Sequence, residues 1–537
     1  MKVRLASCAL VATVALAVPA SADETRVLEG AVPMDGPDHF FVPFEVPEGT
    51  AEIEIRDTRA DKTNVLDRGL DDPKGYRGWG GGTSEPSIIG PRAASRAYVP
   101  GPLSAGTWRI VVGKARIEKS PPTYKYEVVL KTAATLPDQT DRVPYEPRPA
   151  VKSERRWYAG DFHVHSREST DADKVLEEIP SYAKSHGLDF VVVTDHNTVT
   201  QLDYFDGFAQ KYPDVLLIPG NELTTYQGHS GAIGTTKWFD HRIGQPGVTI
   251  EKAIDAIHAE GGLFSINHPA IDIGSICIGC AWKLPVPAEK LDALEIQNLG
   301  VDDGGGIFVT PTFAFWESFL DKGAHVTALG GSDDHSAGTY AKYGELASPL
   351  GSPLTLVYAD ELSAKGILDA VKKGRTVVKM ESVRDPMLEL TSEVTVDDTA
   401  TIHARSTRLH VRVSGGAGRE ATVRWVKTGQ PMEEIDVTAD PFETTLDVRA
   451  PASGEDRYRA EVLINGVKRT VTSHVFVKLD PNGPDVVTNA PPKPASEGDL
   501  EGGGCSGAGT GLGRGSEGIA AVALAACAVV VLRRRRA

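Results

Sequence analysis

The strongest restriction on the fold of this chain comes from a series of apolar segments between residues 156 and 380. Nearly all of them end in a histidine or a carboxylate, and they read DFVVVTDH, VLLIPGNE, GLFSINHP, LDALEIQN and HVTALGGSDDH. Amphipathic stretches such as TIEKAIDAIHAEGG and SAKGILDAVKKG alternate with them. Apolar strands that alternate with helices are typical of a parallel sheet covered by helices. Because the carboxyl ends of parallel strands meet at one edge, we expect the polar residues to gather there.

The regions on either side have a different periodicity. Residues 23–145 contain short alternating runs such as HFFVPFEVP and YKYEVVLKT, and residues 384–478 contain RLHVRVSG and YRAEVLING. Alternation with a period of two is typical of half-buried strands, so we predict a β-sandwich on each side. Within the first of these, the glycine-rich stretch 67–82 is expected to be a loop between strands.

The N-terminus has the pattern of a secretory signal peptide. A basic start precedes an apolar run from Leu5 to Val18, and Ala20-Ser21-Ala22 forms a small-x-small cleavage site. We therefore predict that residues 1–22 are a cleaved signal and that the protein is exported. A signal anchor is the alternative, but the apolar run is short for a membrane span.

The C-terminus carries a second targeting pattern. Residues 479–517 form a linker rich in Pro, Gly and Ser, and residues 518–537 are an apolar segment that ends in an arginine cluster. Together with Cys505 this arrangement resembles the myxobacterial-type C-terminal sorting tail (MYXO-CTERM). That resemblance implies processing near the cysteine and delivery to the cell surface or outer envelope, with membrane contact through the tail at least transiently. A simple transmembrane tail anchor is the alternative.

Charge and cysteine content limit the partners. Acidic residues outnumber basic ones 73 to 57, and no Lys/Arg cluster precedes the final residues, so no nucleic-acid partner is expected. Once the signal and the tail are set aside, Cys277 and Cys280 are the cysteines that remain. Because no second pair completes a zinc site and the compartment is oxidising, we predict a local disulfide; half a zinc site or a redox pair is the alternative.

The segment GDFHVHS places His163 and His165 two residues apart, so on a strand both imidazoles point to one face and can hold one ion. Other strands are followed by His196, Glu222, His229, His268, Asp333 and His335. Buried imidazoles and ionised carboxylates crowded at one edge need a counter-charge, which divalent metals supply. The sequence therefore predicts a metal centre, and the mixed ligands suit Zn, Mn or Fe without choosing among them.

The motifs GDFHVHS, VVVTDHN, GNE, SINHP and GGSDDHS occur in the order found in the PHP (polymerase and histidinol phosphatase) superfamily of metal-dependent hydrolases. The N-terminal pattern DRGL…RGW resembles the CehA/McbA branch of that superfamily. The resemblance covers residues 160–380 and implies an α/β fold, namely a distorted (βα)7 PHP barrel at 156–380. The expected architecture is this barrel flanked by N-terminal and C-terminal β-sandwich domains.

The resemblance also implies a role for each motif residue. His163, His165 and Asp333 correspond to ligands of a first ion, and Glu222 corresponds to a carboxylate that bridges the first and second ions. His268 corresponds to a ligand of the second ion.

The remaining motif residues complete this set. His229, seven residues after Glu222, corresponds to the companion of that glutamate in the CehA-type pattern E…GH, and His196 and His335 correspond to ligands of a third ion. Asp171 would add a carboxylate to that third site, although many relatives have Ser-Asp-Gly one residue earlier. Two or three divalent ions are therefore expected.

These residues predict an exported metal-dependent hydrolase that acts on a small-molecule ester, with a phosphoesterase as the leading hypothesis. Two ions about 3.5 to 4 Å apart can generate a metal-bound hydroxide and neutralise the attacked group. Asp161 and Asp195 precede ligand histidines and, with Glu222, are predicted to assist catalysis by fixing imidazoles or moving a proton. The alternatives are a carbamate or carboxylic ester hydrolase of the CehA type and a non-catalytic cell-surface binding protein.

Overall fold

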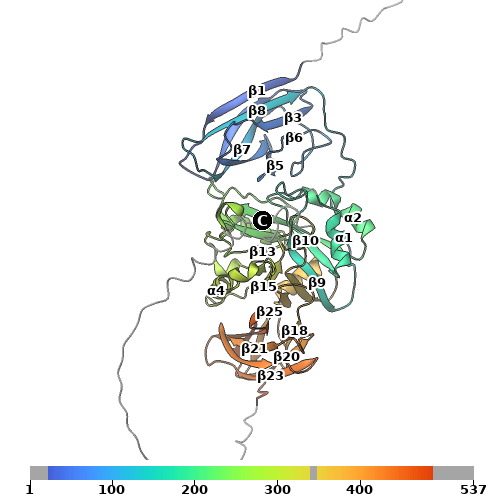
Figure 1. Cartoon of the computed structure of the whole chain (residues 1–537), viewed down its shortest axis with the longest axis vertical. Helices are drawn as coiled ribbons and strands as arrows, with labels where there is room; N and C mark the ends of the chain where they lie inside the picture. The colour runs from blue at the N-terminus through green and yellow to red at the C-terminus, as the bar shows by residue number, and fades with distance from the viewer. Residues whose placement is uncertain (1–21, 174, 339–347, 488–537) are drawn as a thin grey trace, which may run out of the picture. The chain divides into compact units, whose positions relative to one another are not determined.

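The computed structural model describes residues 22–173, 175–338 and 348–487 (Figure 1). The predicted signal peptide, apart from its last residue, and the predicted tail from residue 488 onward, including Cys505, lie outside the described residues. Within the described ranges, no helix has both the length and the apolar character that a membrane crossing requires.

Residues 24–131 form two four-stranded antiparallel sheets. One has the order β1 (Glu24–Ala31), β8 (Thr123–Lys131), β3 (Glu52–Asp57) and β6 (Ser87–Ile89). The other has the order β2 (His39–Val46), β7 (Gly106–Arg116), β4 (Val65–Asp72) and β5 (Gly75–Gly80). Alternate residues such as Ile53 and Ile55 of one sheet and Ile110 and Val112 of the other lie in one shared core. The period-two alternation therefore reflects strands with one buried face.

The glycine-rich stretch 67–82 is not the predicted loop, because most of it belongs to the hairpin of β4 and β5. Asp72 Oδ1 accepts hydrogen bonds from the backbone N–H of Lys74 (2.6 Å) and Gly75 (2.9 Å) and so shapes the turn. Gly78 has φ of 142°, and a Cβ there would lie 2.4 Å from Cδ1 of Tyr98. Gly78 allows the backbone to pack closely against this ring. Glycine is typical both of such close packing and of loops, so the sequence alone does not distinguish between the two.

The central region supplies nine strands to one large sheet. They are β9 (Arg156–Val164), β10 (Phe190–Val193), β11 (Leu216–Thr225), β12 (Gly228–Ile233), β13 (Leu263–Ile266), β14 (Ala293–Asn298), β15 (Thr327–Gly331), β16 (Leu354–Ala359) and β17 (Thr376–Lys379). The order in the sheet is β15-β14-β13-β12-β11-β10-β9-β16-β17. Strands β9 to β11 are parallel and so are β13 to β15, but β12 and β16 run antiparallel to their neighbours.

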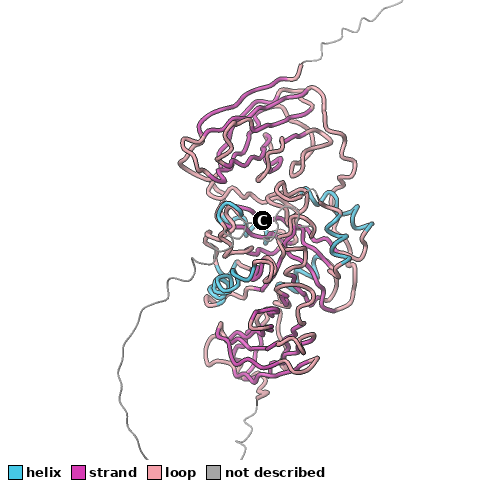
Figure 2. The backbone as a smooth tube through the Cα atoms, in the orientation of Figure 1, coloured by secondary structure: helices cyan, strands magenta, loops and turns pink. Residues whose placement is uncertain are grey.

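The predicted (βα)7 barrel is therefore wrong. The described residues are mostly β, with large multi-stranded sheets and five α-helices: α1 (Glu178–Ser185), α2 (Phe205–Lys211), α3 (Ile250–Ala259), α4 (Val309–Leu320) and α5 (Ala364–Lys372) (Figure 2). Two residues, Tyr226 and Gln227, join β11 to β12, whereas a parallel crossover needs about a dozen or more. Apolar runs reveal buried strands but not the direction in which a neighbour runs.

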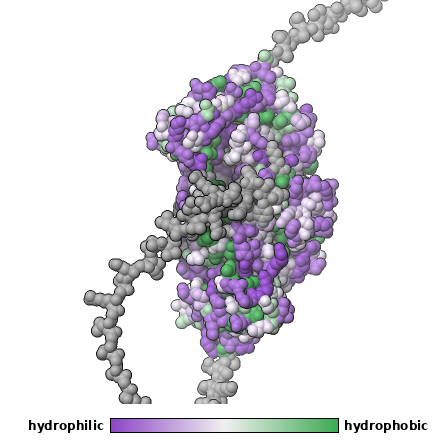
Figure 3. All heavy atoms as spheres, viewed as in Figure 1, coloured by the Kyte–Doolittle hydropathy of each residue, from purple (hydrophilic) through white to green (hydrophobic). Residues whose placement is uncertain are grey.

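The C-terminal region is also β. A three-stranded sheet has the order β18 (Met387–Ser392), β20 (Ser406–Ser414) and β23 (Phe442–Arg449). The other strands are β19 (Thr401–Ala404), β21 (Ala421–Lys427), β22 (Gln430–Asp436), β24 (Glu455–Ile464), β25 (Val467–Thr472) and β26 (Val475–Leu479). Because β25 pairs with β17, these six strands continue the central sheet. Strands β18, β20 and β23 form the separate three-stranded sheet. On the face drawn in Figure 3, hydrophilic residues cover most of the coloured surface.

Backbone hydrogen bonds bring the ends of distant strands together. Beyond the end of β15, Asp333 N donates to His163 O (2.8 Å), and His165 N donates to Asp334 O (2.9 Å). The backbone N–H of Asn197, which follows β10, donates to Glu222 O of β11 (2.9 Å). The polar residues that close these strands therefore meet in one place.

Candidate metal centre

His163 and His165 lie at the end of β9 and face the same side. Their Nε2 atoms are 3.1 Å apart, and Asp333 Oδ1 lies 3.3 Å from the first and 3.0 Å from the second. Ligand atoms that surround Zn²⁺ tetrahedrally at about 2.1 Å are about 3.4 Å from one another. The spacing of these three atoms is therefore suited to one shared cation.

Glu222 lies in β11, is fully buried, and occupies the middle of the cluster. Its Oε1 is 3.1 Å from His163 Nε2, 3.4 Å from His268 Nε2 and 3.6 Å from His229 Nδ1. Its Oε2 is 2.7 Å from His196 Nδ1. The two carboxylate oxygens thus face different histidines, as a carboxylate that bridges two ions must.

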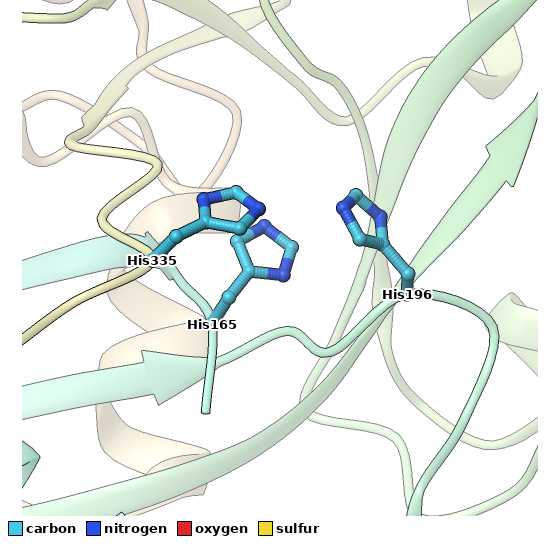
Figure 4. Close-up of side chains that lie close together, drawn as sticks. All are labelled: His165, His196 and His335. Atoms are coloured by element: carbon cyan, nitrogen blue, oxygen red, sulfur yellow. The ribbon is translucent and has the colours of Figure 1, made fainter. Parts of the chain in front are cut away.

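A further group of ligand atoms surrounds Asp171. Asp171 Oδ2 lies 3.2 Å from His196 Nε2 and 3.6 Å from His335 Nε2. The rings of His165, His196 and His335 face a common space (Figure 4) and offer nitrogens within 4.8 Å of one another. We call Asp171, His196 and His335 the Asp171 cluster.

The charges in the centre depend on one another. Burial by itself would raise the pKa of Glu222, but the imidazoles of His163, His229 and His196 lower this pKa well below its usual value. Burial would lower the pKa of His163, but Asp333 and Glu222 raise it well above the ordinary histidine value. The Glu222 carboxylate is therefore ionised and requires nearby positive charge.

The hydrogen bonding of His229, which lies near Glu222 Oε1, indicates whether a cation fits at the centre. His229 is 4% exposed, and among the described residues neither of its ring nitrogens has a hydrogen-bond partner. Buried polar atoms without partners are costly, and a metal ion accepts imidazole lone pairs directly. The residues present therefore fit a divalent cation, and mixed imidazole and carboxylate donors suit Zn, Mn or Fe.

All nine predicted metal ligands lie in this one cluster: His163, His165, Asp171, His196, Glu222, His229, His268, Asp333 and His335. Asp161 and Asp195 lie behind it. Asp161 accepts hydrogen bonds from the backbone N–H of His163 (3.0 Å), Ser332 (3.1 Å) and Gly351 (2.7 Å).

Asp195 accepts from both the N–H and the hydroxyl of Ser166, each at 2.6 Å. Burial raises the pKa of Asp161 and that of Asp195 to about 7. Neither carboxylate is among the described residues that line the cavity at the centre. Their hydrogen bonds hold the backbone that carries the candidate ligands, and their predicted part in catalysis stays a prediction.

One carboxylate at the centre, that of Glu295, was not predicted from the sequence. Glu295 of β14 is buried, and its Oε1 lies 3.2 Å from His163 Nδ1. Its Oε2 accepts hydrogen bonds from His268 N (2.8 Å) and Asn298 Nδ2 (3.2 Å). A carboxylate behind a ligand histidine fixes the ring and its tautomer. The available signal was a charged residue within the apolar run LDALEIQN.

Two hydroxyl groups also contact ligand histidines. Ser169 Oγ lies 3.0 Å from His165 Nδ1, and Thr224 Oγ1 lies 2.6 Å from His196 Nδ1. The contact with Ser169 leaves Nε2 of His165 to face Asp333 and His163. Serine and threonine are common at strand ends, so the sequence carries no signal for them.

A cavity of about 340 Å³ opens onto the centre. One wall comes from the N-terminal sheets and includes Val65, Asp67 and Trp79; another comes from the loop with Ile271, Ile273, Ile276 and Ile278. The predicted disulfide between Cys277 and Cys280 is present in this loop, with Cα atoms 5.7 Å apart. The described lining residues include neither lysine nor arginine.

No family model matches the chain, and no curated protein matches it. Among solved structures, the CARDB domain of a Pyrococcus furiosus protein in complex with di-metal ions is 20% identical over 18% of this chain and 99% of that chain, with a TM-score of 0.14. A putative β-galactosidase from Bacteroides fragilis is 10% identical over 84% of this chain and 73% of that chain, with a TM-score of 0.16. TM-scores this low do not indicate a shared fold.

Proposed function

We propose that this protein is a metal-dependent hydrolase, with a phosphoesterase as the leading function. The proposal is supported by one observation: the buried Glu222 carboxylate has histidine nitrogens within 3.6 Å of both oxygens. Two divalent ions bound there would activate water and offset charge on the attacked group. The order of the histidine and carboxylate motifs, which resembles that of the PHP superfamily, supports the same activity.

The residues of the chain have distinct tasks in this proposal. Glu222 would hold two divalent ions, and Glu295 would orient His163 by accepting from its Nδ1–H. The N-terminal sheets and the loop with Ile271, Ile273, Ile276 and Ile278 form walls of the cavity and would limit the access of bulk water to a bound substrate. Water exclusion strengthens every electrostatic interaction with a bound substrate.

The cavity wall supports a second substrate class. A phosphate dianion is commonly held by arginine or lysine, and neither is among the described lining residues. The two walls of the cavity instead offer apolar side chains such as Ile271, Ile273 and Trp79. A carboxylic or carbamic ester with an apolar group is therefore the alternative substrate.

We also propose that the protein acts outside the cytoplasm, at the cell surface or outer envelope. The N-terminal pattern of residues 1–22 and the C-terminal pattern of residues 479–537 support this location. The disulfide between Cys277 and Cys280 adds support, because disulfides persist mainly in oxidising compartments.

Metal analysis combined with a substrate panel tests the proposal. Purified protein, dialysed gently, is expected to retain at least two divalent ions per chain by inductively coupled plasma mass spectrometry. It is then assayed with aryl phosphate monoesters and diesters, aryl carboxylic esters and aryl carbamates. Turnover of phosphate esters supports the leading function, and turnover of carboxylic or carbamic esters alone replaces it with the alternative. Fewer than two ions and no turnover of any ester would refute the hydrolase.

A further inference from the structure

The loop that carries Asp171 is held by a residue from the N-terminal region. Arg96 Nη1 donates to the carbonyl oxygen of Ala172 (2.9 Å), and Nη2 donates to that of Thr170 (2.6 Å). The guanidinium thus bridges the two residues that flank Asp171. Its planar arrangement of donors allows both bonds at once. Asp171 therefore receives its backbone position from an arginine more than 70 residues away in the sequence.

Other contacts join the same two segments. The backbone N–H of Ala97 donates to Glu168 Oε2 (2.9 Å), and the Thr170 hydroxyl donates to the carbonyl oxygen of Gly81. A Cβ on Gly82, which has φ of 72°, would lie 3.0 Å from Cβ of Asp171. The N-terminal region thus packs directly against the backbone of this loop.

The opposite side of the loop faces the metal centre. Asp173 N donates to the carbonyl oxygen of His335 (2.9 Å), and Asp171 Oδ2 lies 3.2 Å from His196 Nε2. The loop lies outside helices and strands, so side-chain contacts have to supply the rigidity that regular structure gives elsewhere. The side chain of Arg96 is only 14% exposed, so water competes little for its hydrogen bonds to this loop.

We propose that Arg96 is a positioning residue for a third divalent cation, which the Asp171 cluster binds, so that the N-terminal region controls whether this cation site is complete. The proposal rests on the metal centre of the proposed function. Two imidazoles without the carboxylate supply no negative charge to a dication, whereas Asp171 supplies one. When the bridge from Arg96 is lost, the carbonyl oxygens of Thr170 and Ala172 lose their donors and the carboxylate leaves its position.

The test uses Arg96→Met, which keeps the length of the side chain and removes its donors. The metal-free full chain is titrated with Co²⁺, and binding of each equivalent is followed by calorimetry and by the visible absorption of the bound ion. We expect the third equivalent to bind about 10- to 100-fold more weakly than in the unaltered protein, as is typical when a group that orients a ligand is removed. The first two equivalents are expected to bind as before.

Two companion variants separate positioning from general loss of stability. Arg96→Lys keeps one donor and is expected to restore part of the third binding step. Arg92→Met is the matched control, because Arg92 is exposed and pairs with Asp138 at the surface. Its three binding steps are expected to be unchanged.

A double substitution keeps the proposal falsifiable if Arg96→Met alone lowers stability. In an Asp171→Asn background, adding Arg96→Met is expected to have no further effect on the third equivalent, because both changes act through one carboxylate. If Arg96→Met binds the third equivalent as tightly as the unaltered protein does, the inference is overturned. Binding of two equivalents and no third by the unaltered protein also overturns it, while the hydrolase proposal stands. Binding of none refutes the proposed function itself.

Discussion

Glu222 Oε1 lies 3.1 Å from Nε2 of His163, and both side chains are buried. The two residues belong to β11 and β9, which are separated in the sheet by β10. Their side chains therefore reach across a strand to meet, and a negative carboxylate is held among imidazoles. Such an arrangement is stable when a shared cation compensates for the lost hydration of both groups.

Glu222→Gln is expected to remove most of the metal binding and activity. The amide keeps the size of the side chain but loses the negative charge that would hold two ions. The loss of metal affinity should exceed the roughly 10- to 100-fold effect of a residue that only orients a ligand. Metal content and kcat/KM on the best ester of the panel provide the measurements. Glu251→Gln, in an exposed ion pair with Lys290, is the control and should retain both properties.

Removal of metal is expected to lower stability as well as activity. Ions that bind only the folded chain stabilise it by about 2.7 kcal/mol at a free concentration 100 times Kd. Chelation should therefore lower the thermal midpoint measured by calorimetry, and added Zn²⁺, Mn²⁺ or Fe²⁺ should restore it in proportion to the logarithm of concentration. An identical midpoint before and after chelation would argue against a metal that stabilises the fold.

Glu295→Gln is expected to weaken metal binding without unfolding the protein. The carboxylate lies 3.2 Å from His163 Nδ1 and supports the ring orientation that presents Nε2 to the metal position. Loss of that support should cost about 10- to 100-fold in metal affinity. Co²⁺ titration measures the effect, and Glu289→Gln, outside the centre, is the comparison. Equal affinities in the two variants would show that Glu295 does not orient the ligand.

Two histidines away from the centre are expected to make stability depend on pH. The rings of His39 and His241 lie 5.3 Å apart, and both side chains are buried. Burial, with a contribution from Arg242, lowers the pKa of His39 from 6.5 to about 3. Burial, with a contribution from His39, lowers the pKa of His241 well below 6.5. Both histidines are therefore neutral when folded.

Because these pKa values are lowered by folding, the contribution to stability is complete above pH 6.5 and is lost as the pH falls toward 3. His39 should contribute a slope of about 1.4 kcal/mol per pH unit in the free energy of unfolding between about pH 6 and 4, and His241 should add to this slope below pH 6.5. Urea denaturation of His241→Phe should therefore show a shallower slope than the unaltered protein. The exposed His403, replaced by Gln, is the control. An unchanged slope in His241→Phe would contradict the prediction.

The position of the candidate site could be predicted from particular residues. His163 and His165 are two residues apart on a strand, so they must point to the same face wherever the strand lies. Glu222, His268 and Asp333 also follow or close apolar runs that do form strands. Glu295, by contrast, stands inside an apolar run, and its contact with His163 arises from pairing between distant parts of the chain.

The fold could be predicted only in part. The amphipathic stretches at 249–262 and 363–374 form helices α3 and α5, because their periodicity is a local property. The direction of β12 depends on a two-residue turn and on the strands beside it, and the expected barrel fails there. Periodicity reports which faces are buried, and it contains no information on which strands are neighbours.

The amino-acid sequence by itself determined where several buried strands of residues 156–380 lie, which of them end in histidine or carboxylate side chains, and which two cysteines could pair. The tertiary structure decided that β12 and β16 run antiparallel to their neighbours, that Glu295 stands behind His163, and that Arg96 holds the loop of Asp171. The physical reason is the range of the interactions. Strand periodicity and ligand spacing are set within a few residues, whereas these contacts join segments far apart in the chain, and they depend on how whole sheets pack.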